Sequence, residues 1–109
     1  MKWTLEKLRQ ECYKLLVKPT TTVEYADLKH SAESTYGDDG IAIRVNELKM
    51  GAKRCVAHEL IHVLLDKHFR DFANYHLYEL WIASLEKPFF DEMSLKENKK
   101  WERTIRRKL

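Results

Sequence analysis

The stretch that decides the fold runs from Cys55 to Leu65 and has the sequence CVAHELIHVLL. Apart from two histidines and one glutamate, every residue in it is apolar, which is typical of a helix buried at the centre of a small domain. Residues four apart lie one above the other on a helix, so His58 and His62 can direct two imidazoles at one ion. Glu59 is placed to reach a water on that ion, which is the position of a general base.

This H-E-x-x-H motif predicts a zinc site. Zinc binds two imidazoles and a carboxylate readily, and it lowers the pKa of a water in its open fourth position towards neutrality. Polar side chains in so apolar a helix also need partners, which a metal would supply. The alternative is that both histidines are ordinary core or surface residues.

The whole chain sets limits on the kind of protein. At 109 residues it is expected to form a single domain, and its share of 44% hydrophobic and 34% charged residues is ordinary for a soluble protein. The N-terminus carries charges where a signal peptide needs an apolar run, and no segment reaches the length of a membrane span. We therefore expect a cytoplasmic protein without membrane contact, in which Cys12 and Cys55 are buried thiols.

The pattern of elements predicts an α+β, zincin-like fold. Thr4 is an N-cap candidate for the first helix, and Ser94 with Glu97 forms a capping box for the last. The expected helices cover residues 4–17, 51–67, 70–86 and about 95–109, the expected strands cover 20–26 and 41–45, and 30–36 is a strand or a loop. Pro88 should end the third helix. The terminal helices should flank a small antiparallel or mixed sheet packed on the H-E-x-x-H helix.

The third metal ligand is expected on the helix 70–86. If this helix runs antiparallel to the metal helix, residues about 75 to 80 return to the level of the ion. His76 and Glu79 both fall in this window. Glu79 is favoured, because a carboxylate among apolar neighbours is costly unless it binds a metal or is paired.

Other residues near this site have weaker assignments. Tyr75, Tyr78 and His76 are candidates for stabilising an oxyanion, with ordinary packing as the alternative for each. Asp66, one turn beyond the second histidine, should end the helix or orient an imidazole. Cys55, three residues before the first histidine, could approach the metal, although packing is favoured.

These segments resemble a known family. The strand IAIRVN (41–46), the helix AHELIHVLL (57–65) and a following helix with Glu79 are similar to the minimal zincin core of the ImmA/IrrE family and related short proteins of phages and prophages. The resemblance covers about residues 20–86 and implies a gluzincin-like zinc metallopeptidase with Glu79 as third ligand. The glutamate of that family has an E-A-N-like context, which is Glu-Leu-Trp here.

A second resemblance is to SprT-like proteases, which act on DNA-associated proteins. They carry the same H-E-x-x-H helix with a histidine as third ligand. The segment HLYEL (76–80) is similar to their H-G-P-E-F segment but lacks the Gly-Pro. This resemblance implies His76 as the ligand.

The predicted activity is hydrolysis of peptide bonds in an intracellular protein, for which the ImmA/IrrE likeness implies a substrate such as a phage repressor. Glu59 would deprotonate the zinc-bound water and then return the proton to the leaving amine. Strand 41–45 is expected to be the sheet edge beside the cleft, where an extended substrate would add through backbone hydrogen bonds.

Two other functions stay open. The protein could keep zinc for stability alone and act as a catalytically silent regulatory or binding protein. Alternatively, residues 96–109 hold seven basic and two acidic residues, against a total net charge of +3 for the whole chain. With Trp101 among these cations, the last helix could make weak nucleic-acid contact. A solvated basic helix is the simpler interpretation.

Overall fold

The computed structural model describes residues 4–46, 51–66, 82, 84–85 and 88–109. Within these ranges the fold is α+β, with a three-stranded mixed sheet and three long helices. None of the helices so described is long and apolar enough to cross a membrane. The predicted fold class is therefore confirmed at the level of α+β with a small sheet.

The three helices match the predicted segments closely. They are α1 (Leu5–Leu16), α2 (Ala52–Asp66) and α4 (Leu95–Lys108). Both predicted N-caps are confirmed, because the side chain of Thr4 accepts a hydrogen bond from the Lys7 amide and that of Ser94 accepts one from the Glu97 amide, each at 3.1 Å. These side chains satisfy amide groups that the first turn of a helix leaves without partners.

The expected third helix falls mostly on residues 67–81, 83 and 86–87, outside the described residues. Residues 82, 84 and 85 are helical, and so are residues 88–91, where the Glu92 amide donates to the Pro88 carbonyl at 3.2 Å. Pro88 is thus part of a helical turn, a position that proline tolerates at a helix start because its missing amide proton is not needed there. The predicted end of the third helix before this proline lies outside the described residues.

The sheet consists of β1 (Thr21–Tyr25), β2 (Ala32–Gly37) and β3 (Gly40–Val45), in the order β1-β3-β2. β3 runs parallel to β1 and antiparallel to β2. The segment 30–36, left open between strand and loop, is thus largely a strand. The prediction that residues 41–45 form a sheet edge is wrong, because β3 is hydrogen-bonded to a strand on each side. Among the described strands, β2 lies at an edge of the sheet.

On the outer face of the sheet, ion pairs link the central strand β3 to both of its neighbours. Arg44 lies on that face and pairs with a carboxylate on each neighbouring strand, at 3.3 Å from Glu24 and 2.9 Å from Glu33. On the opposite face, Ile41, Ile43 and Val45 are buried against the helices. Side chains alternate between the two faces of a strand, so the sheet is solvated on one face and packed on the other.

The hairpin between β2 and β3 depends on one glycine. Gly40 has a φ of 125°, a conformation that residues with a Cβ rarely adopt, and a Cβ there would overlap the carbonyl oxygen of Thr20. Gly37, at the other end of the turn, has an ordinary φ and open space where a Cβ would be.

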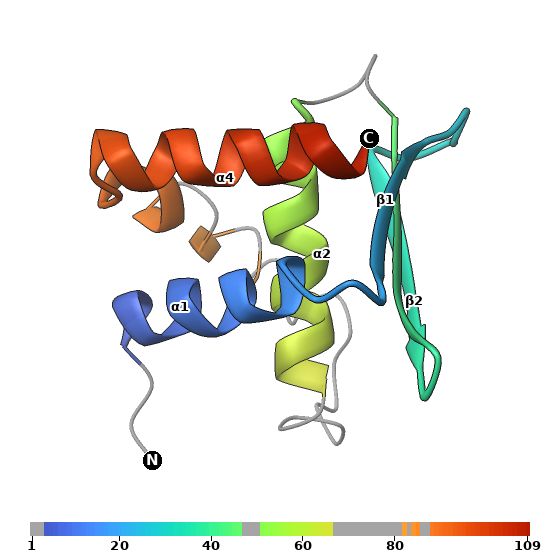
Figure 1. The fold of residues 1–109 in the computed structure, drawn as a ribbon, viewed down its shortest axis with the longest axis horizontal. Coiled ribbons are helices and arrows are strands. Elements are labelled where there is room, and N and C mark those ends of the chain that lie inside the picture. The colour runs from blue at the N-terminus through green and yellow to red at the C-terminus, as the bar shows by residue number, and fades with distance from the viewer. Residues whose placement is uncertain (1–3, 47–50, 67–81, 83, 86–87) are drawn as a thin grey trace.

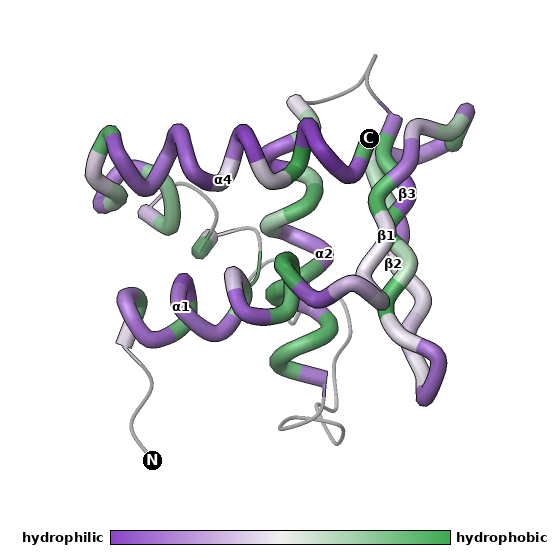
Figure 2. Tube along the Cα trace, viewed as in Figure 1, coloured by the Kyte–Doolittle hydropathy of each residue, from purple (hydrophilic) through white to green (hydrophobic). Residues whose placement is uncertain are grey.

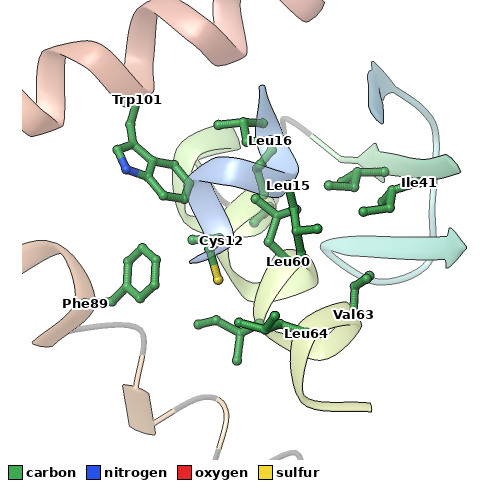
Figure 3. Close-up of a cluster of buried hydrophobic side chains, with 14 of the residues drawn as sticks. Cys12, Leu15, Leu16, Ile41, Leu60, Val63, Leu64, Phe89 and Trp101 are labelled. Carbon is green, nitrogen blue, oxygen red and sulfur yellow. The ribbon is translucent and has the colours of Figure 1, made fainter. Parts of the chain in front are cut away.

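α2 lies at the centre of the molecule (Figure 1), with the sheet on one side and α1 and α4 crossing it on the other. Its apolar residues form the middle of the core together with residues of α1, β3 and the segment before α4 (Figure 3). Cys12, Leu16, Leu60 and Phe89 are all fully buried in this cluster. The prediction that α2 is a buried central helix is confirmed.

Candidate metal centre

α2 brings His58 and His62 together on one face, as the spacing predicts. Their Nε2 atoms are 3.1 Å apart, and the ring centroids are 4.8 Å apart with the rings tilted by 64°. Both residues are half-buried, whereas their apolar neighbours in the helix are buried. The two imidazoles therefore lie at the border between the core and the surface, where an ion could enter.

The residues present fit a metal ion. Two Zn–N bonds of about 2.0–2.1 Å at a tetrahedral angle hold the two nitrogens about 3.3 Å apart. The observed separation of the Nε2 atoms is close to that value, so a small shift of either ring would suffice. Without a metal, the same separation suits a hydrogen bond in which one neutral imidazole donates to the other.

Glu59 lies beside the two histidines, and the three side chains form a group that could hold a metal ion. Within the described residues, one atom each of His58, Glu59 and His62 lie within 4.8 Å of one another, and this is the one such group found there. Glu59 is 7% exposed, and its Oε1 accepts a hydrogen bond from the Ser34 hydroxyl at 2.8 Å. This donor satisfies part of the hydrogen-bonding demand of a carboxylate in a mostly apolar helix.

Two residues of β2 contact polar residues of α2, and sequence reasoning did not identify either of them. Ser34 donates to Glu59, and the Tyr36 hydroxyl donates to Asp66 at 3.1 Å. Both lie on the helix-facing side of β2, two residues apart, so the pairing follows the alternation of the strand. Asp66 ends α2, as predicted, and its carboxylate accepts the hydrogen bond from this tyrosine.

Several predicted site residues lie outside the described residues: Glu79, His76, Tyr75 and Tyr78. The choice between Glu79 and His76 as third ligand therefore stays a prediction. Cys55 is 1% exposed, sits in the core cluster and is not part of the metal-ligating group, in line with the preference for packing.

No family model matches the chain, and comparisons with curated proteins and with solved structures gave no significant match. The likeness to the ImmA/IrrE and SprT-like families thus depends on the residues quoted above. What the geometry itself gives is a His-Glu-His group that can bind a metal ion beside an edge strand.

Proposed function

We propose that this protein is a zincin-like, zinc-dependent metallopeptidase that cleaves peptide bonds in a protein substrate. The observation that carries the proposal is the convergence of the His58 and His62 Nε2 atoms at 3.1 Å, with the Glu59 carboxylate beside them. Two imidazoles and an adjacent carboxylate on one helix match the ligand pair and the base of such enzymes.

Three residues would hold the ion: His58, His62 and, from the following segment, Glu79, with His76 as the alternative. A zinc ion held there supplies a Lewis acid that makes water a stronger acid and polarises a peptide carbonyl. The chain leaves one coordination position for water and substrate if it supplies three ligands. The described residues contribute the first two.

Glu59 has the role of general base and then general acid. Its carboxylate takes a proton from the attacking water and returns it to the leaving amine, so one side chain serves both transfers. The Ser34 hydroxyl donates to Oε1 of this carboxylate at 2.8 Å. We assign Ser34 as a positioning residue that fixes the carboxylate beside the two imidazoles.

The edge strand β2 is the better candidate for binding an extended substrate than β3, which has no open edge. β2 pairs only with β3 in the sheet order of the described residues. Because Ser34 contacts Glu59, the backbone of β2 runs past the general base. A peptide added along the outer edge of β2 would therefore pass close to the metal site. A substrate segment would have to be unfolded or extended to bind in this way.

The test separates metal binding from chemistry. A hydroxamate peptide analogue binds zinc through an open coordination position, so it should raise the Tm of the zinc-loaded wild type and leave that of His62→Ala unchanged. Cleavage of a mixed peptide library, followed by mass spectrometry, should occur with the wild type and fall at least 100-fold in Glu59→Gln, which removes the base.

Glu59→Gln should keep the wild-type zinc content, because the proposal gives this residue no ligand role. A wild type that binds zinc but neither cleaves the library nor responds to the hydroxamate would favour the silent, zinc-stabilised alternative. Equal cleavage by the wild type and Glu59→Gln would refute the assigned base.

A further inference from the structure

α4 carries an uninterrupted basic face on its outer side. At about 100° per residue, six basic residues fall within an arc of roughly 120°. All six are exposed: Lys96, Lys99, Lys100, Arg103, Arg106 and Arg107. The middle of this arc lies opposite Trp101 and Ile105, which are 2% and 3% exposed and anchor the helix in the core. Figure 2 shows the resulting hydrophilic character along most of α4.

The two acidic residues of α4 lie outside this arc, one on each side, and pair with other elements. Glu102 accepts from Lys53 of α2 at 3.1 Å, and Glu97 lies 3.9 Å from the buried Arg9 of α1. Lys108, also outside the arc, donates to the carbonyls of Lys18 and Thr21 at 3.0 and 2.7 Å. The charged residues of α4 outside the arc therefore interact with other elements of the fold, and no acidic residue of α4 lies within the basic face.

The basic face has little compensation within the described part of the chain. Lys100 lies 4.4 Å from the centroid of the Tyr13 ring. The other five have no ion pair with a carboxylate of the described residues. Cations three and four residues apart on a helix repel one another, so the arrangement weakens the isolated helix.

Interaction with the helix dipole accounts for only two of the six cations on the basic face of α4. Arg106 and Arg107 lie in the last turn, where cations interact favourably with the negative end of the dipole. Lys96 lies in the first turn, where a cation is unfavourable, and Lys99 and Arg103 lie where the dipole has little effect. These three are better explained by an anionic partner.

We propose that the outer face of α4 binds the phosphate backbone of duplex nucleic acid without sequence preference. From Lys96 to Arg107 the helix spans about 17 Å at 1.5 Å per residue. Duplex DNA presents one phosphate per roughly 1.7 Å of its axis, so about ten phosphates lie within that length. A row of exposed lysines and arginines suits such contacts, which position a protein but do not read bases.

Other anionic partners fit this face less well. Membrane-surface helices insert an apolar face, but the apolar side of α4 is already buried in the core and only Leu95 and Leu109, near its two ends, are exposed. A protein partner would need apolar or aromatic anchors, which the face lacks. Trp101, considered above as a neighbour of the cations, is buried and cannot stack on a base.

The test measures binding of the full chain to a fluorescent DNA duplex of arbitrary sequence, by anisotropy between 50 mM and 400 mM salt with a chelator present. Arg103→Gln with Arg106→Gln removes two of the six charges of the face, and Gln preserves helix propensity. The control variant, Lys14→Gln with Lys18→Gln, also removes two positive charges. Lys14 lies in α1 and Lys18 in the loop that follows α1. Circular dichroism confirms that each variant is folded.

We expect the logarithm of the wild-type binding constant to fall with the logarithm of the salt concentration at a slope of about −4 to −5, for five phosphate contacts at about −0.9 each. The double arginine variant should lose about two units of this slope. At 100 mM salt it should bind about 60-fold more weakly, if the constants converge near 1 M. The lysine control should change affinity less than threefold.

Three results would overturn this inference: no salt-dependent binding by the wild type, equal losses in the two double variants, or binding to anionic phospholipid vesicles but not to DNA at the same salt. Because the chelator removes any metal, the outcome is independent of the proposed peptidase function.

Discussion

The contact between Ser34 and Glu59 gives the most informative stability prediction, because it joins the edge strand to the metal helix. Ser34→Ala removes the hydroxyl that donates to Oε1 at 2.8 Å, and the carboxylate left behind is only 7% exposed. A hydrogen bond to a charged group contributes about 1.5–3 kcal/mol to stability. Since Ser34 is half-buried, we expect a loss near the lower end, about 1.5–2 kcal/mol.

The assay is urea unfolding followed by circular dichroism, with a chelator present so that no metal contributes. For a chain of this size, a urea m-value of about 1.5–2 kcal/mol per M turns that loss into a midpoint shift of about 1 M. Thr35→Val is the matched control. Thr35 is the next residue on β2, exposed on the opposite face, and valine keeps the β-branched shape. Its effect should stay within about 0.5 kcal/mol.

A double-mutant cycle isolates the contact from the other effects of each substitution. In a Glu59→Ala background, Ser34→Ala should cost less than about 0.5 kcal/mol, because its acceptor is absent, which gives a coupling energy of at least about 1 kcal/mol. A coupling energy near zero would refute the reasoning, since the strand and the carboxylate would then not be in contact. Unequal m-values among the variants would be checked first, because they signal a change in the unfolded state.

Three further predictions concern the fold. Gly40→Ala should destabilise the protein by about 1–3 kcal/mol or more, because φ is 125° and the Cβ overlaps Thr20, while Gly37→Ala should be neutral or slightly stabilising in the same urea assay; equal effects would contradict the hairpin geometry. Leu60→Ala should cost about 2–5 kcal/mol, because the side chain is fully buried at the centre of the core, and a loss below about 1 kcal/mol would argue against a packed centre. Burial raises the pKa of the Cys12 thiol, so iodoacetamide should label it only after unfolding, as followed by mass spectrometry; rapid labelling of the folded protein would show that it is accessible.

The helices could be predicted closely because their signals are local. The expected helix 51–67 is observed as Ala52–Asp66, since a long apolar run with few polar interruptions has few alternatives. The caps at Thr4 and Ser94 depend on residues within one turn, and both were found. Local patterns likewise placed the two histidines and Glu59 together, because their spacing on a helix fixes their geometry.

The order of the strands could not be predicted in the same way. Alternation in residues 41–45 correctly indicates one buried face, but it does not tell how many neighbours the strand has. The partners of Arg44 are Glu24 and Glu33, on two other strands, so its role at the centre of the sheet appears only once the register is known.

The contacts of β2 with α2 were missed for a related reason. Ser34 and Tyr36 occur in a stretch that is polar on both faces, and their partners are 25 and 30 residues away in the sequence. One signal was available. A glutamate in an otherwise apolar helix needs a hydrogen-bond donor, and a polar strand residue on a helix-facing position is a natural source of one.

The central claim is tested most directly by the zinc content per chain, measured by elemental analysis on protein reconstituted with zinc and freed of excess metal. We predict one zinc per chain for the wild type, retention of zinc by Glu59→Gln, and loss of zinc by His62→Ala and by Glu79→Ala, with His76→Ala retaining it. Loss in His76→Ala but not in Glu79→Ala would transfer the third ligand to the histidine and leave the metal site in place. No zinc in the reconstituted wild type would contradict the claim and leave the two histidines as a hydrogen-bonded pair at the edge of the core.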